Sequence, residues 1–251
     1  MSVGHQPDEA YFDRMAAHAR THWWYEGRRR LVAGLLGGRL VPGARVLDVG
    51  CGTGDNLAML AEVAGGPVVG VELSAHAVAR APLGPTGTRV AVARAEELPL
   101  APASVDLACA MDVVEHLDDD VAALEEVRRV LRPAGLLLVT VPAYQWLWSA
   151  HDDRAAHRRR YVRPEVEAVV RRAGFDVERS SYFNSFLVPP AVLLRRTPLR
   201  RLAGEHDEEV GESSAAVGRV MGGLSSAERW RLARGRLPFG LSIFVLARRA
   251  R

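Results

Sequence analysis

The side chains that could carry out chemistry follow two apolar runs of the sequence. Asp112, Glu115 and His116 come directly after the apolar run 105–111, and His116 lies four residues after Asp112. This spacing groups the three side chains if the segment turns helical. His151 follows the next apolar run. Because a neutral imidazole can accept a proton near pH 7, His116 and His151 are the candidate general bases.

A second candidate site is the segment 46–56, Val-Leu-Asp-Val-Gly-Cys-Gly-Thr-Gly-Asp-Asn. Its apolar half is typical of a buried parallel strand, and a helical pattern begins near Asn56. Gly50, Gly52 and Gly54 allow a tight turn and let a ligand approach the backbone without a Cβ in the way. The segment predicts a nucleotide-type site at the carboxyl end of a first strand.

The spacing of the glycines narrows the choice of ligand. In the dinucleotide pattern G-x-G-x-x-G, counted from Gly50, the third glycine would fall on Asp55, whose carboxylate would repel a pyrophosphate. The phosphate loop G-x-x-x-x-G-K-[ST] is absent, and the sequence contains no lysine. The pattern favours a ligand with an adenosine, no phosphate and a cationic centre.

An acidic residue, Glu72, ends the next apolar run, 68–71. A carboxylate at the end of a second parallel strand can accept hydrogen bonds from both hydroxyls of a ribose. The alternative is a charge at a helix N-terminus beside Ser74.

The run 48–54, Asp-x-Gly-x-Gly-x-Gly, resembles the first motif of class I S-adenosylmethionine (AdoMet)-dependent methyltransferases. Segments at 68–74, 94–100 and 105–117 follow in the order of that family, and the resemblance covers residues 20–180 and the final strand. It implies AdoMet as the cofactor, bound by Asp48, Gly50, Cys51, Gly52, Gly54, Glu72, Leu73, Ala95, Glu96 and Met111.

The segment 94–100, Arg-Ala-Glu-Glu-Leu-Pro-Leu, looks like the adenine-contact segment of the family. The family usually begins this segment with Asp, which the chain replaces by Arg94. The resemblance therefore leaves Glu96 or the Ala95 backbone as the adenine contact.

The element Asp112-x-x-Glu115-His116 resembles the Glu-x-x-Glu-His element of ubiquinone-biosynthesis O-methyltransferases and of small-RNA 2′-O-methyltransferases. In those families the element binds a divalent metal, which makes Asp112, Glu115 and His116 an alternative metal site. Because the first acid is Asp and metal-free relatives carry a similar Glu-His, we predict no metal and a general base at His116 or His151. A structural pair of histidines is the other alternative.

Apolar runs alternate with helical patterns, which predicts an α/β fold with a doubly wound, mostly parallel, Rossmann-like sheet of seven strands. We expect an N-terminal helical cap at 1–40, an AdoMet-binding core at 41–182, an insertion at 183–235 and a final core strand in 236–251. The polar segment 143–163 predicts a loop, whose Arg-Arg-Arg-Tyr end suits an anionic substrate group or the solvated start of the next helix.

The insertion predicts an apolar helix from 183 to about 203, an acidic linker at 204–214 and a weaker helix at 219–234. Folded back over the carboxyl edge, the apolar part would wall the acceptor site and favour an apolar acceptor. Its arginine pairs at 195–196 and 200–201 also suit a helix on an anionic membrane surface. Packing on the core or in a dimer is the third alternative.

The composition is ordinary for a soluble globule, with 48% hydrophobic and 25% charged residues. Cys51 and Cys109 form no disulfide framework or metal spacing, which predicts a cytoplasmic location. No basic stretch is interleaved with aromatic residues as in an RNA-binding module, so no nucleic-acid partner is expected.

Together the motifs predict an AdoMet-dependent methyltransferase that O-methylates a small molecule. N- or C-methylation at the same site is one alternative, and an AdoMet-binding cyclase that transfers no methyl group is another. The sequence leaves open the acceptor, the methylated atom and the oligomeric state.

Overall fold

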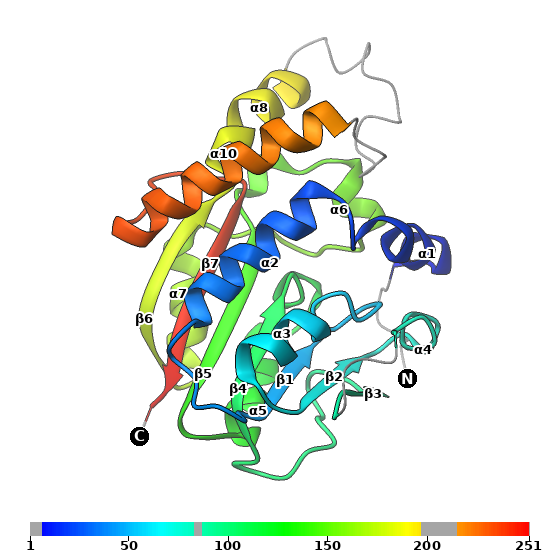
Figure 1. Cartoon of the computed structure of the whole chain (residues 1–251), viewed down its shortest axis with the longest axis vertical. Coiled ribbons are helices and arrows are strands. Elements are labelled where there is room, and N and C mark those ends of the chain that lie inside the picture. Colours follow the sequence, from blue (N-terminus) through cyan, green and yellow to red (C-terminus); the bar gives the residue numbers. More distant parts are fainter. Residues whose placement is uncertain (1–6, 83–86, 197–214, 251) are drawn as a thin grey trace.

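The computed structural model describes residues 7–82, 87–196 and 215–250. A seven-stranded sheet runs through this part of the chain in the order β3-β2-β1-β4-β5-β7-β6 (Figure 1). Its strands are β1 (Val46–Val49), β2 (Val68–Glu72), β3 (Arg89–Val92), β4 (Val105–Met111), β5 (Leu131–Pro142), β6 (Phe175–Phe183) and β7 (Ser242–Arg249).

Most neighbouring strands of the sheet are parallel. β1 pairs in parallel with β2 and β4, and β3 and β5 extend the sheet in parallel on either side. β7 lies antiparallel between β5 and β6. The predicted α/β fold with a mostly parallel seven-stranded sheet is confirmed.

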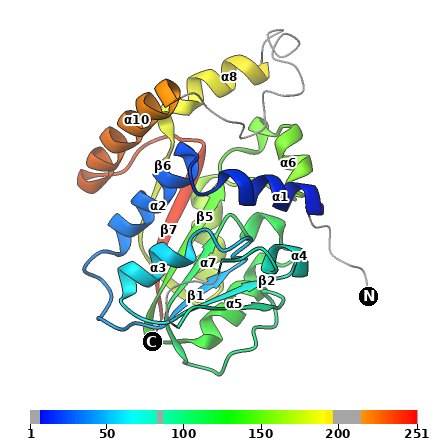
Figure 2. The same cartoon turned by 45° about the vertical axis from the view of Figure 1, so that its right-hand side comes forward.

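Helices cover both faces of the sheet. Figures 1 and 2 show α2 (Trp23–Leu36) and α3 (Leu57–Ala64) on one face and α5 (Asp120–Val130) and α7 (Arg163–Arg172) on the other. α2 packs on the core through Leu31, Val32, Leu35 and Leu36, which recur at helical spacing and are buried. The other helices are α1 (Glu9–His18), α4 (Ala75–Val78), η1 (Val114–His116), η2 (Gln145–Leu147), α6 (Ala150–Arg154), η3 (Ser185–Leu187), α8 (Val188–Arg196) and α10 (Ala215–Arg234).

The strand order places a topological switch point between β1 and β4. The chain builds β2 and β3 on one side of β1 and then crosses to build β4 and β5 on the other side. The loops after β1 and β4 therefore leave the sheet as neighbours at its carboxyl edge. Open α/β sheets bind their ligands at such a point.

Two segments differ from the sequence-based expectation. Residues 143–163, expected as a loop, contain η2 and α6. α6 is too short to show a periodic pattern, and the Asp152 carboxylate closes its first turn by accepting a hydrogen bond from the Ser149 N–H at 2.8 Å. β5 begins at Leu131 rather than at residue 136, because Leu131 pairs with Val105 of β4.

The insertion is described in part. Its apolar segment forms η3 and α8, and its last helix, α10, begins at Ala215 rather than at residue 219. The expected acidic linker at 204–214 and the arginine pair at 200–201 lie outside the described residues.

Candidate functional site

The loop after β1 presents bare backbone. Gly50, Gly52 and Gly54 have φ angles of 62°, 54° and 80°, a region in which side chains other than glycine are strained. A Cβ added to Gly52 would lie 2.7 Å from Met15 Cε of α1, and one added to Gly50 would collide with Val113. The glycines therefore allow both the turn and the close approach of the neighbouring segments.

The carboxylate of Glu72 is held against this loop. One oxygen accepts a hydrogen bond from the Gly52 N–H at 3.0 Å, and the other accepts from the Ser74 N–H at 2.9 Å. A carboxylate can accept about four hydrogen bonds. Glu72 thus keeps acceptor capacity for a ligand while the backbone fixes its orientation.

Asp48, in β1 beneath the loop, is a buried acid with unused hydrogen-bonding capacity. Its side chain is 1% exposed, and its Oδ2 has no hydrogen-bond partner among the described residues. Burial, with a smaller contribution from the charge of Glu72, raises the pKa of Asp48 to about 7, although Arg28 opposes the shift. A cationic ligand beside Asp48 would stabilise its ionised form.

Arg28 of α2 reaches the same edge of the sheet from a helix that precedes β1. It forms an ion pair with Asp112, which also accepts a hydrogen bond from Thr140 Oγ1 at 3.1 Å. Asp112 has a φ of 57°, which turns the chain directly after β4. Our sequence analysis did not single out Arg28, although a signal exists: it precedes Leu31 by three residues and so lies on the buried face of α2.

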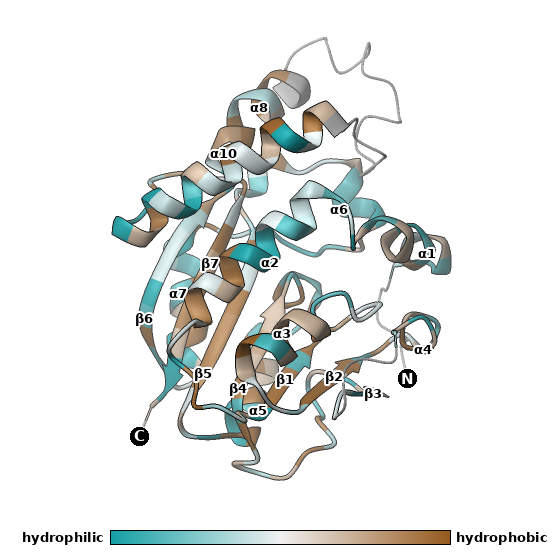
Figure 3. Ribbon diagram, in the orientation of Figure 1, coloured by the Kyte–Doolittle hydropathy of each residue, from teal (hydrophilic) through white to brown (hydrophobic). Residues whose placement is uncertain are grey.

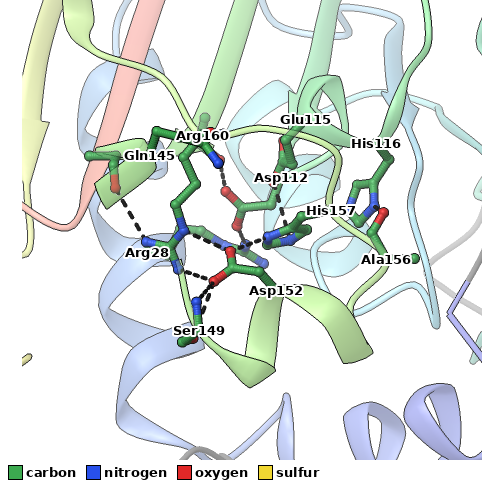
Figure 4. A network of polar contacts seen from close by, with 12 residues as sticks. Arg28, Asp112, Glu115, His116, Gln145, Ser149, Asp152, Ala156, His157 and Arg160 are labelled. Atoms are coloured by element: carbon green, nitrogen blue, oxygen red, sulfur yellow. Dashed lines mark hydrogen bonds and ion pairs between the residues drawn. The ribbon is translucent and has the colours of Figure 1, made fainter. Parts of the chain in front are cut away.

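A second cluster lies beside this ion pair and is formed by Glu115, His116 and His157 (Figure 4). One ligand atom of each residue lies within 4.8 Å of the others. The His116 and His157 rings meet edge to face, with centroids 4.8 Å apart. Asp112, by contrast, is engaged by Arg28, so His157 rather than Asp112 completes the set of three that the structure brings together.

The hydrogen bonds of the two histidines leave the same ring nitrogen available. His116 Nδ1 lies 3.2 Å from the carbonyl oxygen of Ala156, and His157 Nδ1 lies 2.7 Å from Asp152 Oδ1. Since a carbonyl and a carboxylate only accept, the Nδ1 of each histidine donates, and in the neutral His116 the Nε2 carries the lone pair. The Nε2 of His157 lies 3.8 Å from Glu115 Oε1.

Glu115 is an unusual acid because it is wholly buried. Its side chain is 0% exposed, and neither oxygen accepts a hydrogen bond within the part of the chain that the structure describes. Burial, followed by the charge of Asp112, raises its pKa well above the usual range. A proton or a cation at this carboxyl would satisfy it.

Asp152 of α6 anchors the cluster. Its carboxylate accepts a hydrogen bond from His157 and two from Arg160, at 2.7 and 2.8 Å (Figure 4). Burial pushes its pKa upward, but the hydrogen bonds from His157 and Arg160 outweigh burial and hold the pKa well below its usual value. Asp152 is therefore ionised and orients His157.

Both predicted bases are neutral at physiological pH. Burial, followed by the charge of His157, lowers the pKa values of His116 and His151 to about 4. His151 lies on α6, with its ring centroid 6.0 Å from that of His157 and 6.5 Å from that of Tyr11. The structure thus places His116 within the cluster and His151 beside its His157, from the segments after β4 and β5.

The arginines after α6 support the loop between β4 and α5. Arg158 donates to the His116 carbonyl at 2.8 Å, and Arg159 donates to the Leu117 carbonyl at 2.9 Å. Tyr161 donates to Asp120 at 2.8 Å. These side chains thus bind other groups of the protein, which differs from the expected solvated start of a helix.

The comparisons with known proteins agree with this architecture. Residues 47–139 match the family model described as a methyltransferase domain. The [4+2]-cyclase SpnF has a similar structure, with a TM-score of 0.60 at 22% sequence identity, over 99% of this chain and 87% of that one. The chain has the fold of a class I methyltransferase.

The relatives in sequence include proteins with methyltransferase names. A probable S-adenosylmethionine-dependent methyltransferase of Mycolicibacterium smegmatis is 34% identical over 64% of this chain and 62% of the relative. The O-methyltransferase resE of Aspergillus sclerotiorum is 29% identical over 74% of this chain and 76% of the relative. An uncharacterized 37.1 kDa protein in transposon TN4556 of Streptomyces fradiae is 30% identical over 83% of this chain and 63% of the relative. The chain thus spans less than two thirds of the length of the first and third of these relatives.

The methyltransferase fold places the other predicted cofactor residues on the same carboxyl edge. Cys51 and Met111 are buried beside the ends of β1 and β4, and Leu73 follows β2. Ala95, after β3, packs against the core. Glu96 pairs with Arg94 at 3.3 Å, which restrains the segment in which the sequence shows Arg instead of the usual Asp.

Part of the segment 183–235 also reaches this edge of the sheet. Phe186 of η3 contacts Trp23 at the start of α2, with ring centroids 6.5 Å apart. After β5, Tyr144 stacks on Tyr182 of β6 at 5.3 Å. Aromatic contacts therefore connect η3 with α2, and the segment after β5 with β6.

Proposed function

We propose that the protein is an AdoMet-dependent methyltransferase that O-methylates a small molecule. The observation that carries the proposal is the carboxylate of Glu72, fixed by backbone N–H groups beside the glycine loop at the switch point of the sheet. The match of residues 47–139 to the methyltransferase domain model supports it.

The residues present fit AdoMet. The three glycines form a turn with positive φ angles and carry no side chains, and the buried Asp48 has an unsatisfied oxygen that suits a cationic ligand. When bound, AdoMet supplies an activated methyl group on a sulfonium cation. The residues that would hold it are Asp48, Gly50, Cys51, Gly52, Gly54, Glu72, Leu73, Ala95, Glu96 and Met111.

The acceptor would lose a proton to a histidine in the cluster or beside it. His116 is the first candidate, because its Nδ1 donates to Ala156 and its Nε2 keeps a lone pair. His151 is the second, from α6. Holding donor and acceptor in line contributes the rest of the rate.

Two alternatives use the same fold. N- or C-methylation would change only the acceptor atom, and the structural likeness to a [4+2]-cyclase keeps a non-methylating role open. Incubation with AdoMet and a panel of hydroxylated acceptors of increasing apolar character tests all three. Formation of S-adenosylhomocysteine with an O-methylated product supports the proposal, and AdoMet binding without any S-adenosylhomocysteine would contradict it.

Replacing Glu72 by alanine is expected to weaken AdoMet binding by about 1.5–3 kcal/mol, or roughly 10- to 150-fold in Kd. The change removes the acceptor for the ribose and releases the Gly52 and Ser74 N–H groups. Calorimetry measures the effect, and Glu62→Ala on the exposed face of α3 is the matched control. An unchanged Kd in Glu72→Ala would refute the assignment.

A divalent metal is the second candidate ligand of the site, held by Glu115, His116 and His157. Neither oxygen of Glu115 accepts a hydrogen bond among the described residues, and a second group orients each histidine ring through its Nδ1. A metal there would supply charge stabilisation for an ionised acceptor.

The metal alternative predicts a specific pattern of binding. Chelator should stop turnover, and Mg²⁺ or Zn²⁺ should restore it. His157→Ala should abolish metal uptake in elemental analysis and the rise in Tm on metal addition, whereas Asp112→Asn should leave both unchanged. Full activity of a metal-free, chelator-treated preparation would rule this alternative out.

A further inference from the structure

The outer face of α10 carries large apolar side chains that the fold leaves exposed. Val220, Leu224 and Trp230 are 59%, 41% and 62% exposed. The opposite face packs on α2 and buries Ser225 and Leu232. A surface helix usually directs its apolar side chains to the core and its polar side chains to water. α10 instead presents apolar side chains on both faces, so its outer face is suited to a partner.

Arginines share this outer face, and no acid does. Arg219, Arg231 and Arg234 are exposed, and the Arg234 guanidinium lies 3.7 Å from the centroid of the Trp230 ring. The one acid of the helix, Glu228, turns inward and accepts hydrogen bonds from two backbone N–H groups ahead of α8. The outer face is therefore both apolar and positively charged.

The positive charge of the outer face distinguishes between two kinds of partner, a second copy of the chain and an anionic lipid surface. A second copy docked through the same face about a two-fold axis would bring arginines against arginines. An anionic lipid surface offers negative headgroups to the arginines and an interfacial zone to the tryptophan and the aliphatic side chains. We infer that the outer face of α10 binds an anionic membrane surface.

In the inferred contact, α10 lies parallel to the membrane surface. α10 has 20 residues and is thus about 30 Å long. Among residues 7–82, 87–196 and 215–250, no helix is long and apolar enough to cross a bilayer. Figures 1 and 2 show α8 and α10 at the same end of the molecule, and Figure 3 shows apolar residues on both helices.

The sequence suggests a membrane contact for the apolar segment that begins at residue 183. The inferred contact lies on α10 instead. α10 packs on α2, the helix that carries Arg28 into the candidate site. A membrane-bound α10 therefore turns the end of the molecule that adjoins the site toward the lipid. An acceptor dissolved in the bilayer would reach the protein from this side. The membrane contact itself does not depend on the proposed activity.

Vesicle co-sedimentation of the full chain tests the inference. The protein is expected to bind vesicles of phosphatidylcholine mixed with phosphatidylglycerol, to bind phosphatidylcholine alone weakly, and to dissociate as salt screens the charges. Each arginine near an anionic surface contributes on the order of fivefold, so Arg231→Glu with Arg234→Glu should lower the partition coefficient roughly 25-fold or more. Val220→Glu with Leu224→Glu should also abolish binding.

Matched changes at the other end of the molecule serve as controls. Val92 of β3 is 53% exposed, and Figure 1 shows β3 in the lower part of the molecule, away from α10. Val92→Glu and the charge-matched pair Arg89→Glu with Arg172→Glu should bind vesicles like the unaltered chain, and circular dichroism checks that every variant is folded.

Three results would overturn the inference. The first is equal binding to neutral and anionic vesicles, and the second is an equal loss in the α10 variants and the controls. The third is a concentration-dependent dimer in sedimentation velocity that Val220→Glu with Leu224→Glu abolishes, since it would assign the face to a second copy of the chain.

Discussion

Replacement of His116 by alanine is expected to lower kcat by about 10²- to 10⁴-fold, the usual contribution of a positioned general base. The affinity for AdoMet should not change, because His116 is not among the predicted cofactor contacts. The expectation rests on the ring geometry: the Ala156 carbonyl occupies Nδ1, which leaves the lone pair on Nε2, and the ring meets that of His157 edge to face. Single-turnover formation of S-adenosylhomocysteine measures the chemical step, and calorimetry measures AdoMet binding.

Two further variants test whether the expected loss of turnover is specific to His116. His151→Ala tests the second candidate base, and His18→Ala, at the end of α1, controls for the loss of a histidine elsewhere. If His116→Ala and His151→Ala both keep full turnover in metal-free protein, neither histidine is the base, and positioning of the two substrates is the main source of rate.

The pH profile provides an independent check on the base. A base with a pKa near 4 stays unprotonated, and therefore competent, at every pH above that value. The acid limb of kcat is then expected near pH 4 and not near pH 6.5, the value for an unperturbed histidine. An acid limb at 6.5 that disappears in a histidine variant would place the base in a more exposed environment than that of His116.

Replacement of Asp152 by alanine is expected to lower the free energy of unfolding by about 3–5 kcal/mol. The Asp152 side chain is 0% exposed and holds the buried Arg160 by two hydrogen bonds and His157 by one. Its removal leaves the Arg160 guanidinium buried without its anion. Urea unfolding monitored by circular dichroism measures the loss.

Asp153→Ala is the matched control for this variant. Asp153 is the next residue of α6 and is exposed, where it accepts a hydrogen bond from Trp148 Nε1 at 2.9 Å. Its loss should change stability by less than about 1 kcal/mol. Equal stabilities of the Asp152 and Asp153 variants would show that the buried pair of Asp152 and Arg160 adds no more to stability than the exposed contact of Asp153.

The contribution of Asp152 should depend on pH in a defined direction. Its folded-state pKa lies well below that of an unfolded Asp, about 3.9. The stability that it adds is therefore fully present above pH 4 and is lost progressively as the pH falls below that value. The difference between the unaltered chain and Asp152→Ala should shrink in acid, and a difference that grows in acid would contradict the assignment.

Several features were predictable from the sequence because they depend on neighbours along the chain. The alternation of apolar runs with helical patterns predicted the seven-stranded sheet, and the glycine spacing after Val49 predicted a bare loop, since only glycine adopts its positive φ angles without strain. The place of Glu72 at the end of β2 followed from the same local pattern.

The partners within the candidate site depend on the packing of distant segments. Arg28 meets Asp112 across 84 positions, because α2 packs over the sheet with its buried face toward the end of β4. Sequence spacing grouped Asp112 with Glu115 and His116, but the ion pair with Arg28 engages Asp112, and the chain beyond α6 brings His157 to the cluster instead.

The loop between β5 and α7 shows the physical reason most clearly. In the sequence, His151, Asp152 and His157 are polar residues of a segment that has neither helical nor strand periodicity. Only when the loop folds onto the carboxyl edge does Asp152 become buried, pair with Arg160 and orient His157. The types of the reactive groups and their edge of the sheet follow from local sequence, whereas their pairing and their charge states follow from burial, which arises only when the whole chain is packed.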